Sequence, residues 1–227
     1  MIVGKIEPRQ RSLVLNMGKS DMQKTTGIYS MLSAAWVYEA WITLLGGKRK
    51  RQILVNKYIR PEKGMKILDC GCGPAEIVAF LPEVEYLGID LSPAYIEKAR
   101  AKFGDHAEFQ VQSAAAIAVS GRKFDLVLAL GLIHHLNDEQ AKVLLETAYT
   151  ALMPEGRLLT FDGVFVEKQS PLARFFLKRD RGQNVRWQKE YESLAAGVFG
   201  SVNVVSDIRT DMTRIPYTHI LMECRKH

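Results

Sequence analysis

Apolar residues along the chain alternate between short continuous runs and longer stretches with helical spacing. Five short runs, typical of buried strands, cover residues 66–70, 84–89, 107–111, 124–130 and 157–164. Between them, apolar positions recur three and four residues apart and predict helices that bury one face. The clearest such face contains Ala141, Leu144, Leu145, Ala148 and Leu152. This alternation predicts an α/β fold, in which parallel strands are joined by right-handed crossovers.

Capping residues mark the ends of several predicted helices. Ser92, followed by Pro93, begins a helix that Gly104 ends. Asn137 begins another, with two acidic residues in its positively polarised first turn. A short helix is also expected to open at Pro74, where its N-terminus would attract an anionic ligand group.

Two further segments flank this central region. Residues 1–60 predict an N-terminal helical segment covering the ligand pocket, with one helix from Ile28 and a shorter one over 48–59. Residues 61–227 form the expected ligand-binding domain, completed by a helix over 188–199 and strands over 202–208 and 218–224. Residues 165–187 lack a clear period and are interpreted either as a lid or as a surface ion-pair cluster.

The candidate ligand site follows the first strand, because open α/β sheets bind ligands beyond the carboxyl ends of their strands. The turn there contains Asp69, Gly71, Cys72 and Gly73, and its glycines permit a tight turn close to a ligand. A dinucleotide fingerprint would need a third glycine where Glu76 stands, which argues against a nicotinamide cofactor. Asp90 ends the second strand, where a carboxylate can accept hydrogen bonds from both hydroxyls of a ribose.

Four motifs occur in order along residues 60–165: DCGCGPA at 69–75, GIDLS at 88–92, FDLVLALGLIHHL at 124–136 and LMPEGRL at 152–158. Together they resemble the class I S-adenosylmethionine (SAM)-dependent methyltransferases. The resemblance implies a Rossmann-like, seven-stranded, mostly parallel sheet of order 3-2-1-4-5-7-6, with helices on both faces and an antiparallel last strand. It also implies SAM as the cofactor and methyl transfer as the reaction.

The resemblance also implies roles for individual residues. In this resemblance, the turn of Asp69, Gly71, Cys72 and Gly73 binds the methionine part of SAM, and Asp90 binds the ribose. Leu91 contacts the adenine, and Leu130 and Gly131 lie beside the sulfonium. Two positions depart from the family pattern. Ala75 replaces a frequent third glycine, and Gln112-Ser113-Ala114 replaces a frequent acid, which leaves Ser113 as the candidate adenine contact. Tyr38 is a candidate roof of the pocket, although helical aromatics more often belong to a core.

The candidate catalytic residues are His134, His135 and Asp162. An imidazole suits proton removal near pH 7, and a base is needed only if the acceptor keeps its proton. Either histidine could instead pack or cap near Asn137, and Asp162 could steer an acceptor or cap a turn. Cysteine and histidine spacing matches no zinc site, so no metal is expected.

The net charge of +6 permits an anionic partner without requiring one. A small-molecule methyl acceptor is the expected partner. A nucleic-acid acceptor is the second interpretation, opposed by the absence of an Asn-Pro-Pro-Tyr box and of a Pro-Cys pair. Docking on a membrane surface through residues 28–51 is the third. The odd number of cysteines and the polar start of the chain predict the reducing cytoplasm.

Overall fold

The computed structural model describes residues 47–180 and 182–226. The predicted helix from Ile28 and the candidate roof residue Tyr38 lie outside this part of the chain. None of the helices in the described ranges is long and apolar enough to cross a membrane.

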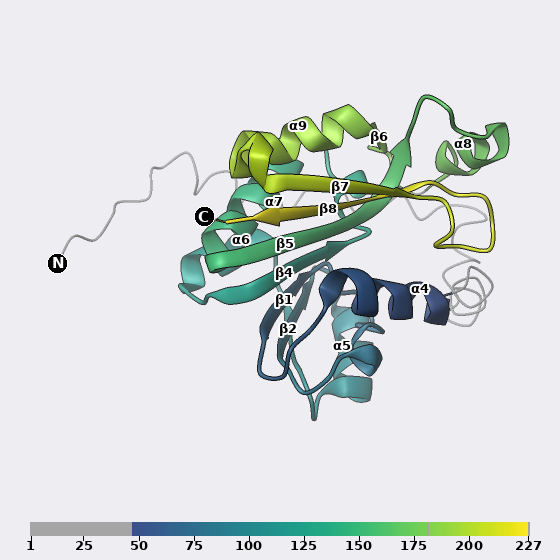
Figure 1. The fold of residues 1–227 in the computed structure, drawn as a ribbon. Helices are drawn as coiled ribbons and strands as arrows, with labels where there is room; N and C mark the ends of the chain where they lie inside the picture. Colours follow the sequence, from purple (N-terminus) through teal and green to yellow (C-terminus); the bar gives the residue numbers. More distant parts are fainter. Residues whose placement is uncertain (1–46, 181, 227) are drawn as a thin grey trace. The chain divides into compact units, whose positions relative to one another are not determined.

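The centre of the fold is an eight-stranded sheet with the order β3-β2-β1-β4-β5-β8-β7 and a short β6 paired to β5 (Figure 1). Its strands are β1 (Lys66–Cys70), β2 (Glu85–Asp90), β3 (Glu108–Val111), β4 (Phe124–Leu130), β5 (Leu152–Phe165), β6 (Arg186–Trp187), β7 (Val204–Arg209) and β8 (His219–Arg225). The first five strands are parallel, and β8 is antiparallel to both β5 and β7. The predicted fold class and strand order are therefore confirmed, with β6 as an additional strand.

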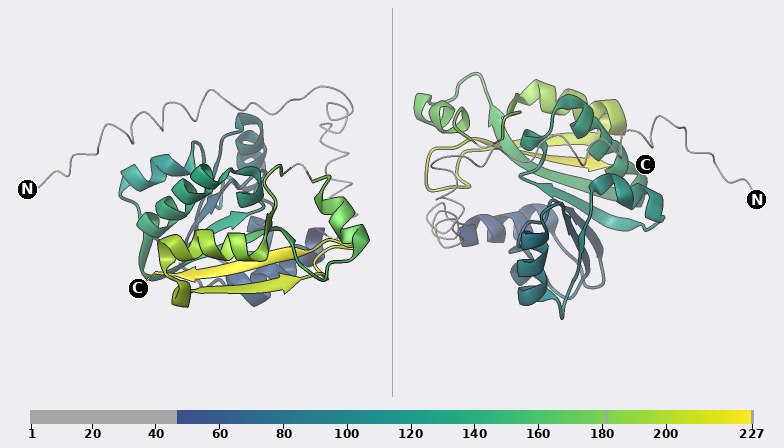
Figure 2. Two further views of the ribbon diagram at one scale, coloured as in Figure 1. Left: turned by 90° about the horizontal axis from the view of Figure 1, so that it is seen from above. Right: turned by 180° about the vertical axis from the view of Figure 1, so that it is seen from behind.

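Helices cover both faces of the sheet (Figure 2). They are α4 (Gly47–Ile53), the π-helix η1 (Leu54–Ile59), η2 (Val78–Phe80), α5 (Pro93–Phe103), α6 (Ala114–Ser120), η3 (Ile133–His135), α7 (Asp138–Ala151), α8 (Pro171–Leu177), α9 (Gln188–Phe199) and η4 (Ser201–Asn203). One core contains residues of η1 and α5, and the other contains residues of α7 and α9. β4 contributes to both because its side chains alternate: Leu126 and Leu128 face the first core, and Val127 and Ala129 the second.

Local capping explains the helices that the sequence predicted well. Asn137 and Gln140 form a reciprocal capping box at the start of α7, with each backbone N–H donating to the other side chain at 2.9–3.1 Å. Ser92 accepts from the backbone N–H of Tyr95 at the start of α5. The predicted inward face of α7 is buried, including Ala141, Leu144, Leu145 and Ala148.

Two predictions about local structure are wrong. No helix opens at Pro74, because the chain continues in turns, with Ala75 left-handed at φ 53°, and forms only the short η2. Residues 165–187 are not an irregular loop, since they contain α8 and β6. The helix α6, between the third and fourth strands, was not predicted.

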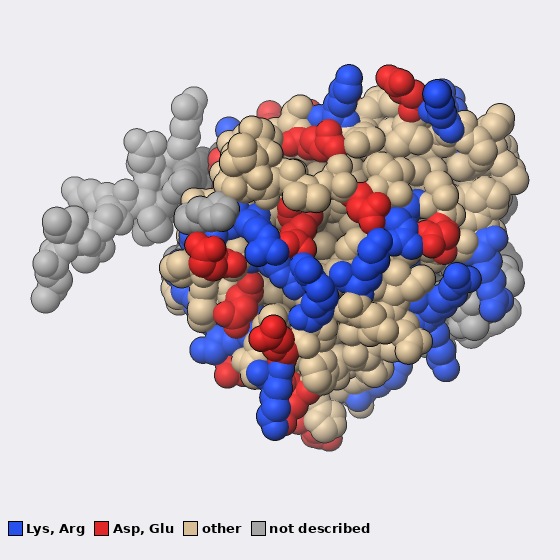
Figure 3. All heavy atoms as spheres, in the orientation of Figure 1, with Lys and Arg blue, Asp and Glu red and all other residues tan. Residues whose placement is uncertain are grey.

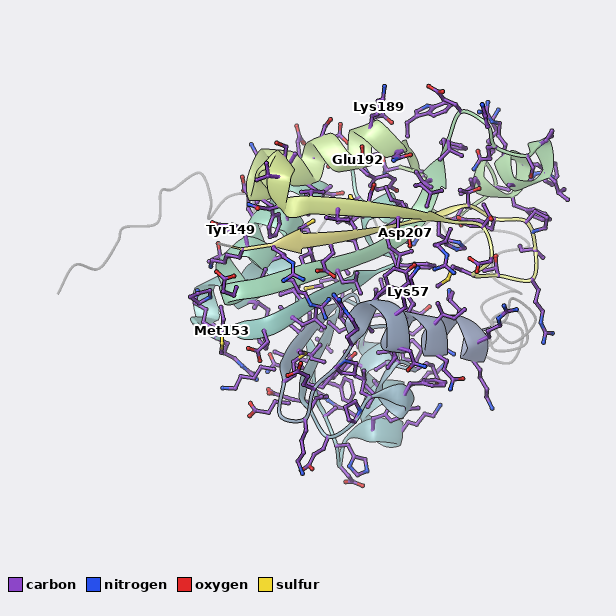
Figure 4. All side chains as sticks on the ribbon, in the orientation of Figure 1. Lys57, Tyr149, Met153, Lys189, Glu192 and Asp207 are labelled. Atoms are coloured by element: carbon purple, nitrogen blue, oxygen red, sulfur yellow. The ribbon has the colours of Figure 1, made fainter. Side chains whose placement is uncertain are left out.

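Arg157 joins the N-terminal part of the described chain to the sheet. Its guanidinium is buried and donates to the carbonyl oxygens of Tyr58, at 2.9 Å, and Ile59. These carbonyls belong to the last turn of η1 and would otherwise lack partners. On the same face, Lys57 and the hydroxyl of Tyr58 both bond Asp207 of β7, at 3.3 and 2.6 Å (Figure 4). Residues 54–59 are therefore fixed against β5 and β7.

Candidate functional site

The turn after β1 is shaped by left-handed backbone at Gly71, Gly73 and Ala75, whose φ angles are 71°, 54° and 53°. The backbone N–H groups of Gly71 and Cys72 donate to the carbonyl oxygen of Ile89, which holds the turn against the end of β2. A Cβ atom on Gly71 would lie 3.0 Å from Leu132. Glycine at position 71 therefore serves both the backbone angle and the close approach of the segment after β4.

Asp90 connects the turns after β1 and β2. One carboxylate oxygen accepts from the backbone N–H of Gly73 at 3.0 Å, and the other accepts from that of Ser92 at 2.8 Å. Each carboxylate oxygen has two acceptor sites, so one site on each oxygen remains for a ligand hydroxyl. The two turns that the sequence singled out separately thus share one carboxylate.

Asp69 lies at the base of the same turns and is almost fully buried. One of its oxygens accepts from the hydroxyl of Tyr86 at 2.6 Å, and the other has no partner among the described residues. Burial raises the pKa of Asp69 to about 7, and the nearby charge of Asp90 adds to the rise. The contribution of Tyr86 was missed, because in sequence it is only one apolar position of a buried strand.

The remaining predicted cofactor positions line the same edge of the sheet. Leu91 is 71% exposed despite its apolar side chain. Ser113 precedes α6. The backbone N–H of the residue before it, Gln112, donates to the backbone carbonyl oxygen of Asp90 at 3.1 Å. The thiol of Cys72 packs beneath the turn, where a Cβ on Gly88 would lie 2.9 Å from its sulfur. Cys72 therefore also packs against β2 as a small side chain of the turn.

Leu130 and Gly131 end β4, and Gly131 is held at φ 75° by a backbone bond to Phe161 of β5. A Cβ on Gly131 would lie 3.8 Å from the imidazole of His134, in the following turn η3. The segment after β4 therefore contacts the glycine turn, where Leu132 lies against Gly71, and it also carries the candidate catalytic histidines.

His134 and Asp162 form a buried pair. The Nδ1–H group of His134 donates to Asp162 Oδ1 at 2.7 Å, and the backbone N–H of His134 donates to the same oxygen at 3.1 Å. Burial lowers the pKa of His134, but the hydrogen bond and charge of Asp162, together with the charge of Asp180, raise it above its usual value. His135 is exposed and its ring stands 4.2 Å from that of His134. The geometry thus distinguishes the two histidines, which the sequence alone did not.

Asp180, Gly182 and Asn184 lie against His134. Asp180 Oδ1 lies 3.5 Å from its Nε2 atom, and the backbone N–H of Asn184 donates to the carbonyl oxygen of His134 at 2.9 Å. Gly182 lies so close to the ring that any side chain at this position would collide with it. The predicted lid segment is therefore packed directly on the candidate base.

Arg186 holds this arrangement together. Its buried guanidinium donates to the carbonyl oxygens of Ile133, Leu136 and Asn184 at 2.7–3.2 Å and to Asp138 at 2.9 Å. Arg186 belongs to the segment 165–187, which the sequence analysis interpreted either as a lid or as a surface ion-pair cluster. In the structure it is a buried cross-link between β6 and η3, and only the complete tertiary arrangement reveals this.

Two basic groups near His134 were also missed. Lys50 Nζ lies 5.2 Å from the ring centroid of Phe161, and burial, with the charge of Arg51, lowers the pKa of Lys50 to about 8. His219 stacks on Phe161, and burial, with the charges of Lys50 and His134, lowers its pKa to about 3. In sequence Lys50 is one of four consecutive basic residues, 48–51, and nothing local distinguishes it from the others.

Comparison with known proteins identifies the fold and its motifs. Residues 67–156 match the family model of a methyltransferase domain. This match covers most of β1, all of β2, β3 and β4 with the turns that follow them, and the start of β5, whereas Asp162 and the segment 165–187 lie beyond it. Residues 67–156 therefore match a methyltransferase domain, as the sequence motifs predicted, within the strand order expected of class I SAM-dependent methyltransferases. Within the described residues, no group of three or more His, Cys, Asp or Glu side chains is suited to hold a metal ion.

Individual relatives match this chain over part of their length. The ubiquinone biosynthesis O-methyltransferase of Azorhizobium caulinodans is 31% identical over 99 residues, which are 39% of each chain. A probable tRNA methyltransferase 9B of Bos taurus is 26% identical over 128 residues, 56% of this chain and 27% of the bovine protein. The chain thus spans well under half the length of these two relatives.

A solved structure supports the fold over a longer range. A Haemonchus contortus N-methyltransferase, in complex with phosphomonomethylethanolamine and S-adenosylhomocysteine, superposes with a TM-score of 0.67 at 14% identity. The superposition covers 86% of this chain and 58% of the nematode protein.

The residues around the two turns fit SAM. The unpartnered oxygen of Asp69 can accept from an ammonium group, and the carboxylate of Asp90 retains acceptor sites for two hydroxyls. The left-handed glycines leave backbone accessible between these two acids. The donor and acceptor pattern therefore matches an amino acid joined to a ribose.

Proposed function

We propose that this protein transfers a methyl group from SAM to a small-molecule acceptor. The observation that carries the proposal is the carboxylate of Asp90, which joins the turns after β1 and β2 and keeps acceptor sites for a ribose. Asp69, Gly71, Cys72 and Gly73 hold the methionine part in this proposal. Leu91 and Ser113 contact the adenine, and Leu130 and Gly131 lie beside the sulfonium.

SAM supplies a methyl group activated by positive sulfur. The chain's own residues position the acceptor and handle its proton. Asp162 fixes the Nδ1–H tautomer of His134, which leaves Nε2 as the atom that takes a proton. Because its pKa is raised, His134 is a stronger base than a free imidazole once it is deprotonated. Asp162 is a positioning residue here, and His135 lies outside this buried pair.

Coverage of the site completes the proposal. The segment 165–187 shields the reacting atoms from water. The packing of Asp180, Gly182 and Asn184 on His134 supports this role.

A small-molecule acceptor is favoured over RNA. The Azorhizobium relative is named for ubiquinone biosynthesis, and the nematode structure holds a small phosphorylated amine. On the face shown in Figure 3, acidic side chains lie among the lysines and arginines. Lys57, Arg60 and Arg209 each pair with a carboxylate. The bovine relative is named as a tRNA methyltransferase, so RNA is the second candidate.

The first experiment is calorimetric titration with SAM, S-adenosylhomocysteine and NAD. We expect the first two to bind and Asp90→Ala to weaken both by at least about tenfold, since it removes charge-assisted hydrogen bonds to the ribose. Asp105→Ala removes an exposed carboxylate elsewhere and is the matched control. Binding of NAD alone, or equal affinity of the Asp90 variant, would refute the assignment.

The acceptor is then sought by incubating metabolite extracts and total RNA with methyl-labelled SAM. We expect label in small molecules. Label found only in RNA, with transfer falling steeply as salt rises, would instead establish the second candidate.

A further inference from the structure

A hollow of about 510 Å³ is lined by residues of the segment after β5, of α8 and β7, and of the loop that joins β7 to β8. It is lined by Val166, Lys168, Gln169, Ser170, Ala173 and Ile208 on one part of its wall, and by Thr210, Thr213, Arg214, Ile215, Pro216, Tyr217 and Thr218 on the other. Its volume lies in the range of small-molecule sites. The carboxyl end of β5 forms part of this region, so the hollow lies at the edge of the sheet that carries His134.

The charges around the hollow have one sign. Lys168 and Arg214 line it, and no aspartate or glutamate does. Within residues 47–180 and 182–226, neither cation takes part in an ion pair. Many other cations in this range do have carboxylate partners, among them Arg60 and Arg209. A partly enclosed wall with two uncompensated positive charges favours an anionic ligand group.

The rest of the lining is mixed. Four hydroxyl side chains, Ser170, Thr210, Thr213 and Thr218, offer hydrogen bonds, while apolar side chains such as Ile208 and Ile215 offer contact surface. Such a lining suits an organic molecule with an apolar body better than a free inorganic ion.

Tyr217 connects the hollow to the candidate base. It lines the hollow, and its hydroxyl donates to Asp180 Oδ2 at 2.5 Å. The other oxygen of Asp180 lies 3.5 Å from His134 Nε2. Tyr217 and Asp180 therefore connect the wall of the hollow to the imidazole.

We propose that this hollow binds the methyl acceptor, and that the acceptor is an organic molecule with an anionic group held by Lys168 and Arg214. The proposal rests on the methyltransferase function proposed above and narrows its substrate class. The anionic group anchors the acceptor, and the apolar part of the hollow holds its body.

The first test uses a matched pair of probes, phenylacetate and phenylacetamide, which differ in charge but little in shape. Saturation-transfer NMR and titration should show phenylacetate binding about tenfold more tightly, with the difference shrinking at high salt. Inorganic phosphate should compete with phenylacetate. Equal binding of the acid and the amide would overturn the proposal.

Variants locate this binding. Lys168→Gln combined with Arg214→Gln should abolish the preference for the acid, while Lys189→Gln should leave it intact. Lys189 is an exposed lysine at the start of α9 (Figure 4). It does not line the hollow and has no ion-pair partner among the described residues. A preference for the acid that survives the double substitution would place the anion elsewhere and contradict the assignment.

Acceptor chemistry is tested by separating a metabolite extract into anionic and neutral pools on an ion-exchange resin. We expect label from SAM to enter the anionic pool, with KM rising in the double variant. Transfer into the neutral pool alone would overturn the inference and leave the methyltransferase function standing. Absence of S-adenosylhomocysteine binding would instead defeat that function, while the two probes would still report on the hollow.

Discussion

Replacing Asp69 with asparagine tests the cofactor turn through the stability of the protein. Burial raises the pKa of Asp69 to about 7, whereas an exposed aspartate titrates near 3.9, and each pKa unit is worth about 1.4 kcal/mol. Keeping this carboxylate ionised in the fold therefore costs about 4 kcal/mol at pH 8. Asparagine keeps an oxygen for the hydroxyl of Tyr86 and carries no charge.

The sign of the pH dependence follows from the raised pKa. Between pH 4 and 7 the folded protein holds a proton on Asp69 that the unfolded chain has released, so stability falls as pH rises. From pH 5 to pH 8 the wild type should lose about 2.5 kcal/mol of unfolding free energy relative to Asp69→Asn. The unpaired amide of the variant lowers its stability by about 1–3 kcal/mol at every pH, so it shifts the difference without changing its slope.

Urea unfolding of both proteins at several pH values measures this difference directly. Titration with S-adenosylhomocysteine provides the functional counterpart: wild-type affinity should rise with pH up to about 7, because the ionised carboxylate pairs with the ligand ammonium, and the variant should bind weakly at all pH values. A stability difference that stays constant from pH 5 to pH 8 would refute the buried, proton-binding carboxylate.

The remaining predictions concern backbone conformation, the buried arginine and the base. Gly197→Ala, in the exposed face of α9 where a Cβ meets nothing within 4 Å, should raise stability by about 0.5–1 kcal/mol in urea unfolding. Gly71→Ala should lower the unfolding free energy by about 1–2 kcal/mol because the backbone at Gly71 is left-handed. A Gly71→Ala variant more stable than Gly197→Ala would contradict both backbone assignments. Arg186→Met should cost about 2–4 kcal/mol by leaving several carbonyl oxygens unpaired, and an unchanged unfolding midpoint would show that water replaces the guanidinium. His134→Gln should slow transfer to a proton-bearing acceptor about 10²–10⁴-fold and remove the rise in rate with pH, while His135→Gln should change the rate less than about tenfold; the reverse result would exchange their roles.

The sequence predicted what local chemistry decides. The helices α5, α7 and α9 were placed correctly because caps and apolar spacing act within a few residues of each other. Buried parallel strands were equally clear as continuous apolar runs. The helix expected at Pro74 failed because the same proline and glycines also suit a series of turns, and the tertiary bonds of Gly71 and Cys72 to Ile89 select the turns.

Long-range partners could not be predicted from the sequence. Tyr86 beside Asp69, and Asp180 beside His134, are joined only when strands and loops distant in the chain meet. The sequence therefore located the candidate acids and histidines but gave no means of ranking His134 above His135. Burial and the bond to Asp162 supply that ranking.

The cross-link made by Arg186 divides the segment 165–187 into an anchored part and a part that Arg186 does not hold. Arg186 anchors the chain to the carbonyl oxygens on both sides of His134, whereas α8 and the part of the hollow lined by residues 166–173 lie upstream of this anchor. Substitutions in α8 can therefore reshape the space beside Tyr217 without moving the imidazole of His134. A scaffold built this way can change which molecules it accepts while keeping its proton-handling pair in place.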